Sequence, residues 1–169
     1  AAREAAYGNA SADFDSCGVV IGSSRGATRS FEKFHSQFIS TGKSSAVMSP
    51  ATTGVAIPAA VAGALGCKGP SLYVSSACQT GLTALGVACS LIQTGQARRM
   101  LAGGAEASVT PFTLGGLDAL KILSHSRDVY PLKSGEPGRE GTVLSEGATV
   151  FMLAGGEEIE KGQVRPRAE

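Results

Sequence analysis

The sequence predicts an α/β fold with a mostly parallel sheet covered by helices on both faces. Short apolar, β-branched runs alternate along the chain with longer helical patterns, and glycine, proline or serine separates them. Because the short runs are almost continuously apolar, both of their faces are expected to be buried, as in a parallel sheet. The 169 residues fit one domain, or one half of a larger two-domain unit, at about 150 residues per domain.

The predicted strands share an apolar run followed by a turn signal. They are 17–21, 72–76, 98–102 and 148–153. Cys78 comes just after the second run, and the tetrapeptide Gly103-Gly104-Ala105-Glu106 follows the third and is predicted as a sharp loop. Active groups of such sheets gather at the carboxyl ends of the strands, so these two strand ends are candidate positions for a site.

The predicted helices share longer patterns of period 3.6. They are 27–41, 49–66, 78–94 and 111–123. In the first helix Phe31, Phe34 and Phe38 form a stripe that Gly42 ends. The third carries one apolar stripe and one stripe of small residues, so it is expected to be buried on two sides.

The remaining segments are predicted from their polarity and turn residues. They are an irregular loop at 124–140, a turn with a short acidic helix at 155–161, the end of a helix at 1–7 and the start of a strand at 164–169. The last two predict a chain that begins and stops inside an element.

Composition argues against several classes of partner. Fifteen Lys and Arg against fourteen Asp and Glu give a net charge of +1, which offers no footprint for nucleic acid or an anionic membrane. No apolar run approaches the about 18 residues of a membrane span, and no leader is visible, so a soluble cytoplasmic protein is expected. The charged residues, at 17%, are few, which indicates a small surface or one partly covered by a partner.

Four cysteines, Cys17, Cys67, Cys78 and Cys89, are widely spaced without a C-x-x-C pair. Reduced thiols are therefore expected, with no disulfide and no metal site. Cys78 lies where an apolar strand meets a helix, and the exposed amides and dipole of that helix start would stabilise a thiolate. This is the position of a nucleophile, whose own amide could donate to an oxyanion. The alternative is a small buried hydrophobe, the commonest fate of a cysteine.

Several motifs carry a family resemblance in their order and spacing. They are V-S-S-A-C-Q-T-G at 74–81, L-A-G-G-A-E at 101–106, G-P at 69–70, T-P at 110–111 with G-G at 115–116, R-E-G at 139–141 and V-L-S-E-G-A at 143–148. The set resembles the β-ketoacyl-acyl carrier protein synthases, most closely the elongating branch of synthase I/II and polyketide ketosynthases. Thiolases share a cysteine segment, but the Gly-Gly-Ala-Glu form favours a ketosynthase.

The resemblance implies a thiolase-like fold of three α/β/α layers, of which residues 1–169 would be a partial N-terminal ketosynthase domain, about one of two pseudo-repeat halves. It implies an acyltransferase of fatty acid or polyketide synthesis. Cys78 would accept an acyl group from carrier-protein phosphopantetheine, and a malonyl unit would then lose CO2 and attack the acyl thioester. No bound cofactor is implied. The implied partners are an acyl carrier protein and a second subunit, in a homodimer or heterodimer that joins at strand 72–76, an edge strand in the family.

The resemblance also assigns residues to an acyl pocket and to a structural loop. Thr52 and Thr53 would line the pocket, although a helix cap explains them equally well. Thr113 and Leu117 stand where relatives have Gly and Phe, so the preferred acyl chain length cannot be carried over.

The glycine-rich loop with Gly103 and Gly104 would be held by two carboxylates, Glu106 and Glu146. Both are expected to be buried and hydrogen-bonded to backbone amides, in structural rather than catalytic roles. The pair Arg98-Arg99 is interpreted as a solvated strand entry rather than a carrier-binding patch.

Family members promote decarboxylation with two histidines and a lysine in the second half of the fold. This chain has only His35 and His125, neither at a matching position, and both are expected to be structural or solvated. The chain is therefore interpreted as an internal piece, about 40% of a typical family chain, that does not complete a condensation alone. Two alternatives stay open: a non-catalytic partner like a chain-length factor, which the retained Cys78 disfavours, and a truncated fragment without activity.

Overall fold

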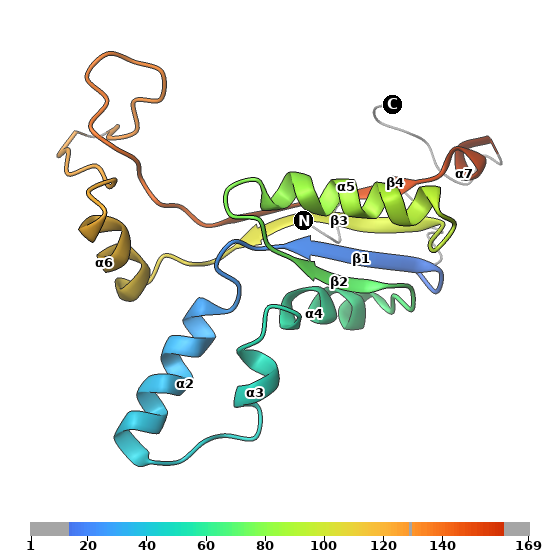
Figure 1. The fold of residues 1–169 in the computed structure, drawn as a ribbon, viewed down its shortest axis with the longest axis horizontal. Coiled ribbons are helices and arrows are strands. Elements are labelled where there is room, and N and C mark those ends of the chain that lie inside the picture. Colours follow the sequence, from blue (N-terminus) through green and yellow to red (C-terminus); the bar gives the residue numbers. More distant parts are fainter. Residues whose placement is uncertain (1–13, 129, 161–169) are drawn as a thin grey trace.

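A computed structural model of the chain describes residues 14–128 and 130–160. Its core is a four-stranded sheet in the order β2-β1-β3-β4 (Figure 1). The strands are β1 (Cys17–Gly22), β2 (Ser71–Val74), β3 (Arg99–Glu106) and β4 (Gly147–Ala154). β1 runs parallel to β2 and β3, whereas β4 is antiparallel to β3. The mostly parallel α/β fold is confirmed; the elements predicted at 1–7 and 164–169 lie outside the described residues.

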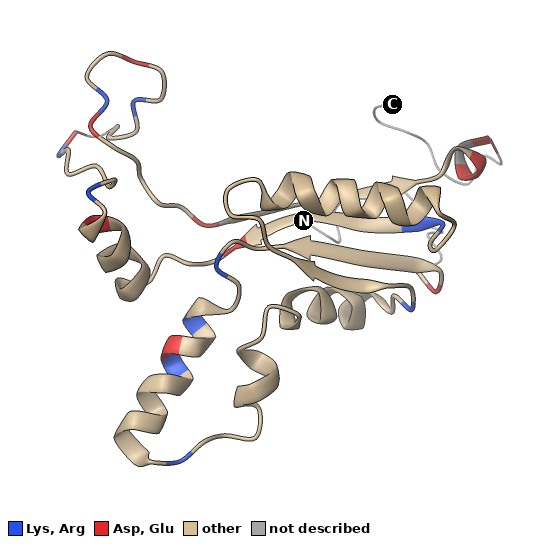
Figure 2. Cartoon of the chain, viewed as in Figure 1, with Lys and Arg blue, Asp and Glu red and all other residues tan. Residues whose placement is uncertain are grey.

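Two helices, α4 (Ala56–Leu65) and α5 (Thr80–Gln93), cover the two faces of this sheet. The other described helices are α2 (Thr28–Thr41), α3 (Met48–Ala51), α6 (Pro111–Ala119) and α7 (Gly156–Glu160). α5 lies on one face and α4 on the other, while α2, α3 and α6 extend away from the carboxyl ends of β1 and β3 (Figure 1). Most of the layered core carries uncharged residues, and charged residues lie on α2, in the 124–140 loop, on α7 and at the ends of the strands (Figure 2).

The core explains why the strands are almost continuously apolar. Successive side chains of a strand point to opposite faces, so Val20 of β1 packs with Ala84 and Ala88 of α5, whereas Val19 and Ile21 pack on the α4 side. All six residues of β1 are buried. The central strand is therefore covered on both faces, as the sequence predicts.

The prediction of a sharp loop at 103–106 is wrong. These residues are the second half of β3, in register with 147–150 of β4. Gly103 makes this pairing possible, because a Cβ there would lie 2.0 Å from the Thr149 carbonyl oxygen. Gly103 therefore serves close backbone approach within the sheet rather than a turn.

Two predicted helices are shorter than expected. The 49–66 helix is interrupted between α3 and α4, where Gly54 meets the ring of Tyr73 so closely that a Cβ would lie 2.5 Å from Cε1. The 111–123 helix ends at Ala119, and Lys121 then adopts a left-handed φ of 56°. Both helices stop where the chain must turn to meet another segment.

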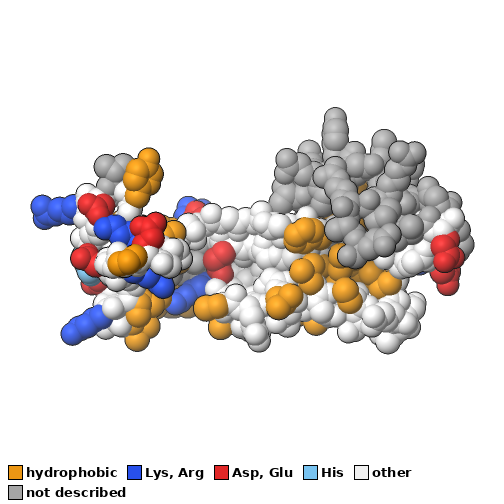
Figure 3. Space-filling view, turned by 90° about the horizontal axis from the view of Figure 1, so that it is seen from above, with side chains coloured by type: hydrophobic (Ala, Val, Ile, Leu, Met, Phe, Trp, Pro, Cys, Tyr) orange, Lys and Arg blue, Asp and Glu red, His pale blue; other side chains and the backbone are white. Residues whose placement is uncertain are grey.

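Helix α5 is buried on one side only among the described residues. Ala84 and Ala88 of its small-residue stripe are buried together with Thr80 on the side of the sheet. On the apolar stripe, Leu82 is 72% exposed and Cys89 is exposed, while Leu85 and Ile92 are only partly buried, so the prediction of two buried sides is wrong here. Hydrophobic side chains are visible on this side of the molecule (Figure 3). α2 likewise has no buried residue, and its Phe31 is exposed.

A buried ion pair fixes α7 to the sheet. Nη2 of Arg99 lies 2.6 Å from Oε2 of Glu158, and Nε of the same arginine donates to that oxygen at 2.8 Å. The expectation of a solvated strand entry is therefore wrong for Arg99, because an acidic partner on α7 offsets the loss of hydration.

Within the described ranges, no helix combines the length and the apolar character needed to cross a bilayer.

Candidate active site

Cys78 occupies a tight turn between β2 and α5, directly before the N-cap residue Gln79. Ala77 has a left-handed φ of 52°, uncommon for a residue with a Cβ. The hydroxyl of Thr80 fastens the turn: it accepts from the amide of Ser76 at 2.8 Å and donates to the carbonyl of Ala77. The turn therefore presents Cys78 as an exposed thiol.

The start of α5 gives this thiol an electropositive neighbour. The first amides of a helix lack partners inside it, and its dipole favours negative charge at that end. Close packing sets this end onto the strands: a Cβ at Gly22 would lie 2.3 Å from the Thr80 methyl group, and one at Gly104 would lie 3.4 Å from Cα of Gly81. The small residues of β1, β3 and α5 thus bring the cysteine turn to the strand ends.

The turn opens onto a cleft of about 410 Å³. Four segments converge on it: the cysteine turn with the start of α5, the end of β1, the end of β3 and the start of β4. The lining residues are Gly22, Ser23, Ser24, Ala77, Cys78, Thr80, Gly81, Leu85, Gly103, Gly104, Ala105, Glu106, Gly147, Ala148, Thr149 and Phe151. Both strand ends singled out in the sequence therefore meet in one cleft.

Glu106 fixes one wall of this cleft. Its carboxylate accepts from the amide of Ser24 at 2.9 Å, from the hydroxyl of Ser23 at 3.1 Å and from the amide of Arg25 at 3.3 Å. The side chain is half-buried, so the prediction that it is buried is wrong, whereas the predicted hydrogen bonds to backbone amides are present. A carboxylate that accepts several donors of one loop holds that loop in one shape, which is the structural role predicted for it.

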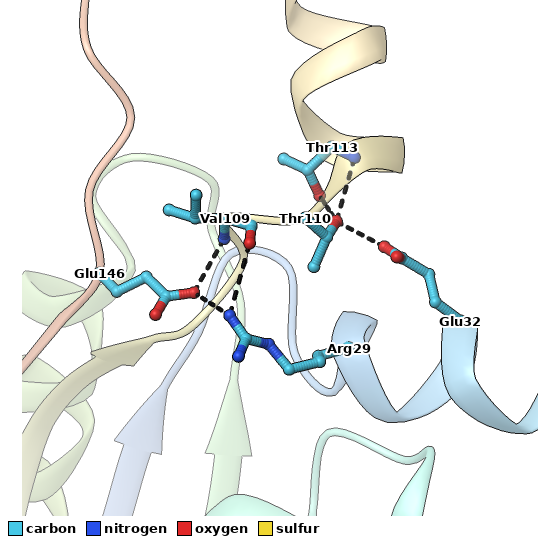
Figure 4. A network of polar contacts seen from close by, with 6 residues as sticks. All are labelled: Arg29, Glu32, Val109, Thr110, Thr113 and Glu146. Carbon is cyan, nitrogen blue, oxygen red and sulfur yellow. Dashed lines mark hydrogen bonds and ion pairs between the residues drawn. The ribbon is translucent and has the colours of Figure 1, made fainter.

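A second polar network joins α2 to the loop after β3 (Figure 4). One oxygen of Glu146 lies 2.8 Å from the Arg29 guanidinium and accepts from the amide of Val109 at 3.0 Å. The hydroxyl of Thr110 donates to Glu32 and accepts from the amide of Thr113 at 3.2 Å. Glu146 is hydrogen-bonded as expected, but its predicted burial is wrong because it precedes edge strand β4 and its partner is exposed.

The proposed acyl-pocket residues do not line this cleft. The hydroxyls of Thr52 and Thr53 donate to the carbonyls of Met48 and Pro50 at 2.8 and 3.0 Å, as in helix-end residues. Thr113 and Leu117 both belong to α6, where Thr113 is buried and Leu117 is half-buried. Their role in acyl binding stays a prediction.

The two histidines lie away from the cleft. His35 is exposed and stacks on Phe31, with ring centroids 5.9 Å apart. Nε2 of His125, also exposed, lies 3.0 Å from Asp118. These exposed positions fit the solvated or structural roles expected for both histidines. In the part of the chain that the structure describes, no cluster of three His, Cys, Asp or Glu side chains could hold a metal ion.

The four cysteines are free thiols in two different settings. Burial, together with the neighbouring Cys67 thiol, raises the pKa of Cys17 to about 12, and burial also raises the pKa of Cys67. Cys78 and Cys89 are exposed. Of these two, only Cys78 lies in the cleft.

Sequence analysis missed the contribution of Ser23 and Ser24 to the cleft. A signal was available, because both follow the apolar run of β1 and so lie at the carboxyl end of a third parallel strand. Arg29 could not be found in this way, since its partner Glu146 lies 117 residues further along the chain.

An α/β/α fold that presents a cysteine at a helix start, beside a glycine-rich strand end, defines a protein of the thiolase-like class. The family model described as Beta-ketoacyl synthase, N-terminal domain, matches residues 1–158. The chain belongs to this family.

Curated relatives agree with this assignment. The chain is 40% identical over 157 residues to a 3-oxoacyl-[acyl-carrier-protein] synthase 2 of Vibrio harveyi, covering 88% of this chain and 36% of the relative. It is 34% identical to the synthase of the same name in Staphylococcus aureus, covering 89% and 38%. The chain thus spans little more than a third of the length of these relatives.

Solved structures share the fold. A type II polyketide synthase acyl-carrier protein in complex with its ketosynthase, bound to the hexaketide, matches with a TM-score of 0.75 and 26% identity over 89% of this chain and 40% of that one. The ishigamide ketosynthase/chain length factor matches with a TM-score of 0.67 and 25% identity, covering 88% and 38%. A β-ketoacyl synthase from Burkholderia phymatum, at 24% identity, matches in fold with a TM-score of 0.73.

Proposed function

We propose that Cys78 is the nucleophile of a β-ketoacyl-acyl carrier protein synthase and accepts an acyl group from a carrier-protein thioester. The observation that carries the proposal is the exposed Cys78 thiol at the start of α5, inside the cleft formed by the ends of three strands. Cys89, the other exposed thiol, lies outside the cleft. The relatives named as 3-oxoacyl-[acyl-carrier-protein] synthases support the reaction class.

In the proposed transfer the Cys78 sulfur, as its thiolate, attacks the carbonyl carbon of the acyl thioester. The new C–S bond gives a tetrahedral oxyanion, which amide donors at the cysteine turn and helix start would stabilise. The bond to the pantetheine sulfur then breaks, and that sulfur leaves as a thiolate that takes up a proton. The product is an acyl thioester on Cys78, and no oxidant or metal is consumed.

The second half of the proposed reaction joins this acyl group to a malonyl unit that loses CO2, in fatty acid or polyketide synthesis. His35 and His125 lie away from the cleft, so the groups that promote decarboxylation are proposed to come from elsewhere. An acyl carrier protein would deliver both substrates in the cytoplasm. The edge strand β2, whose Ser71 and Leu72 are exposed, would pair with a second ketosynthase subunit.

An acyl-transfer assay tests the proposal. The chain is incubated with a decanoyl-pantetheine thioester, its mass is measured and the acylated peptide is mapped. We expect one decanoyl group on Cys78, released pantetheine thiol in equal amount, no acylation of Cys78→Ala, and unchanged acylation of the matched variant Cys89→Ala. Acylation that survives in Cys78→Ala, or no acylation of the wild-type chain, would overturn it.

A second candidate is a non-catalytic partner that shapes the product of another ketosynthase. The similarity to the ishigamide ketosynthase/chain length factor supports this second candidate. It predicts no acylation of Cys78 together with stable association with a catalytic ketosynthase subunit. The acyl-transfer assay, followed by analytical ultracentrifugation with such a subunit, separates the two candidates.

A further inference from the structure

The side chain of Tyr73, on strand β2, contacts the loop that follows the neighbouring strand β1. Its hydroxyl donates to the carbonyl oxygen of Ser23 at 2.7 Å. Two glycines make room for it: a Cβ at Gly54 would lie 2.5 Å from Cε1 of the ring, and one at Gly26 would lie 3.3 Å from the hydroxyl oxygen. The half-buried ring is therefore held in one place by backbone on two sides.

Ser23 is fastened through its other atoms as well. It is 2% exposed, its hydroxyl donates to Glu106 at 3.1 Å, and the same oxygen accepts from the amide of Gly26 at 2.8 Å. Ser23 and its neighbour Ser24 line the cleft with Cys78, whereas Tyr73 does not. Tyr73 thus touches the wall of the cleft from behind, through a hydrogen bond to a buried carbonyl group.

We propose that Tyr73 is a positioning residue that sets the shape of the Ser23–Ser24 wall and thereby the fit of the acyl group delivered to Cys78. The inference rests on the function proposed above. A backbone carbonyl that loses its partner in a half-buried site must find water or shift. Glu106 holds the wall from within the cleft and Tyr73 from outside, so removing the Tyr73 hydroxyl frees the wall on one side without touching the thiol.

The test compares a bulky reagent with a small one at the same sulfur. Tyr73→Phe removes the hydroxyl and keeps the ring against Gly54; Tyr130→Phe removes the same atom from a residue that is 82% exposed and outside the cleft. Rates of acylation by decanoyl-pantetheine and of alkylation by iodoacetamide are measured at Cys78 and Cys89. We expect Tyr73→Phe to slow decanoyl transfer to Cys78 about three- to tenfold, the worth of one hydrogen bond. Its alkylation rates at both cysteines, and all rates in Tyr130→Phe, should match wild type.

The outcomes separate this inference from the proposed function. If wild-type Cys78 is acylated no faster than Cys89, the proposed function fails and the inference falls with it. If wild type is acylated selectively and Tyr73→Phe is acylated at the same rate, the inference alone is overturned. A Tyr73→Phe chain that reacts differently with iodoacetamide at Cys78 or Cys89 also overturns it, because the hydroxyl would then support the fold as a whole.

Discussion

The carboxylate of Glu106 and the amide of Ser24, 82 positions apart in the sequence, are joined by a hydrogen bond of 2.9 Å. This contact ties the end of β3 to the loop after β1, two segments that line the cleft containing Cys78. Glu146, by contrast, makes its ion pair outside the cleft, with an exposed arginine of α2. The two glutamates therefore differ in what they hold in place.

Replacing these glutamates should have unequal costs. Glu106 is half-buried and accepts from several donors of one loop, including the hydroxyl of buried Ser23. Glu106→Gln leaves one acceptor oxygen there, so we expect a loss of about 1–3 kcal/mol in the free energy of unfolding. Glu146→Gln weakens a solvent-exposed pair and should cost at most about 1 kcal/mol. Urea unfolding of both variants checks this. Equal losses would contradict the assignment of Glu106 to the cleft wall.

Glycine-to-alanine substitutions in the sheet and in helix α5 should have opposite effects on stability. A Cβ at Gly103 would collide with the backbone of Thr149 and Val150, so Gly103→Ala should cost more than about 3 kcal/mol or prevent folding. At Gly86, in α5, a Cβ would meet nothing within 4 Å. Gly86→Ala should stabilise the chain by up to about 1 kcal/mol. Thermal unfolding measures both, and a tolerated Gly103→Ala would disprove the close pairing of β3 with β4.

The buried pair between Arg99 and Glu158 should respond differently to single and double replacement. Arg99→Met removes the guanidinium that contacts the buried Glu158 carboxylate, at an expected cost of about 3–5 kcal/mol. Arg99→Met with Glu158→Leu removes both charges and should recover most of that loss. Urea unfolding in a double-mutant cycle tests the coupling. A double variant as unstable as the sum of the single variants would show that the pair is not coupled.

The stability of the chain should fall at alkaline pH because of Cys17. Burial raises its pKa from an ordinary value of 9.0 to about 12, so between these pH values the folded chain keeps a proton that the unfolded chain has released. The free energy of unfolding should therefore decrease above pH 9, by about 1 kcal/mol per pH unit. Cys17→Ala should lessen this slope and Cys89→Ala, at an exposed position, should keep it. Urea unfolding at several pH values measures the slopes; identical slopes in the two variants would contradict the burial effect.

Local patterns predicted the order of the elements and the place of Cys78. The apolar run of β1 and the junction before α5 contain that information within a few residues. The partners of Gly103 and Glu106 are distant in the sequence, so a Gly-Gly pair that permits strand pairing looked like a turn. Local patterns also failed on the exposed side of α5, because a stripe of apolar residues indicates burial without specifying which segment covers it.

The reactivity of Cys78 relative to Cys89 in the same molecule tests the central claim most directly. Decanoyl-pantetheine is added to the native chain and to the chain unfolded in urea, and the acylated peptides are quantified over time. If the cleft and the start of α5 make Cys78 a nucleophile, its acylation rate should exceed that of Cys89 by at least about tenfold in the native chain, and the ratio should fall to near one in urea. A native ratio near one, or a high ratio that persists in the unfolded chain, would contradict the account.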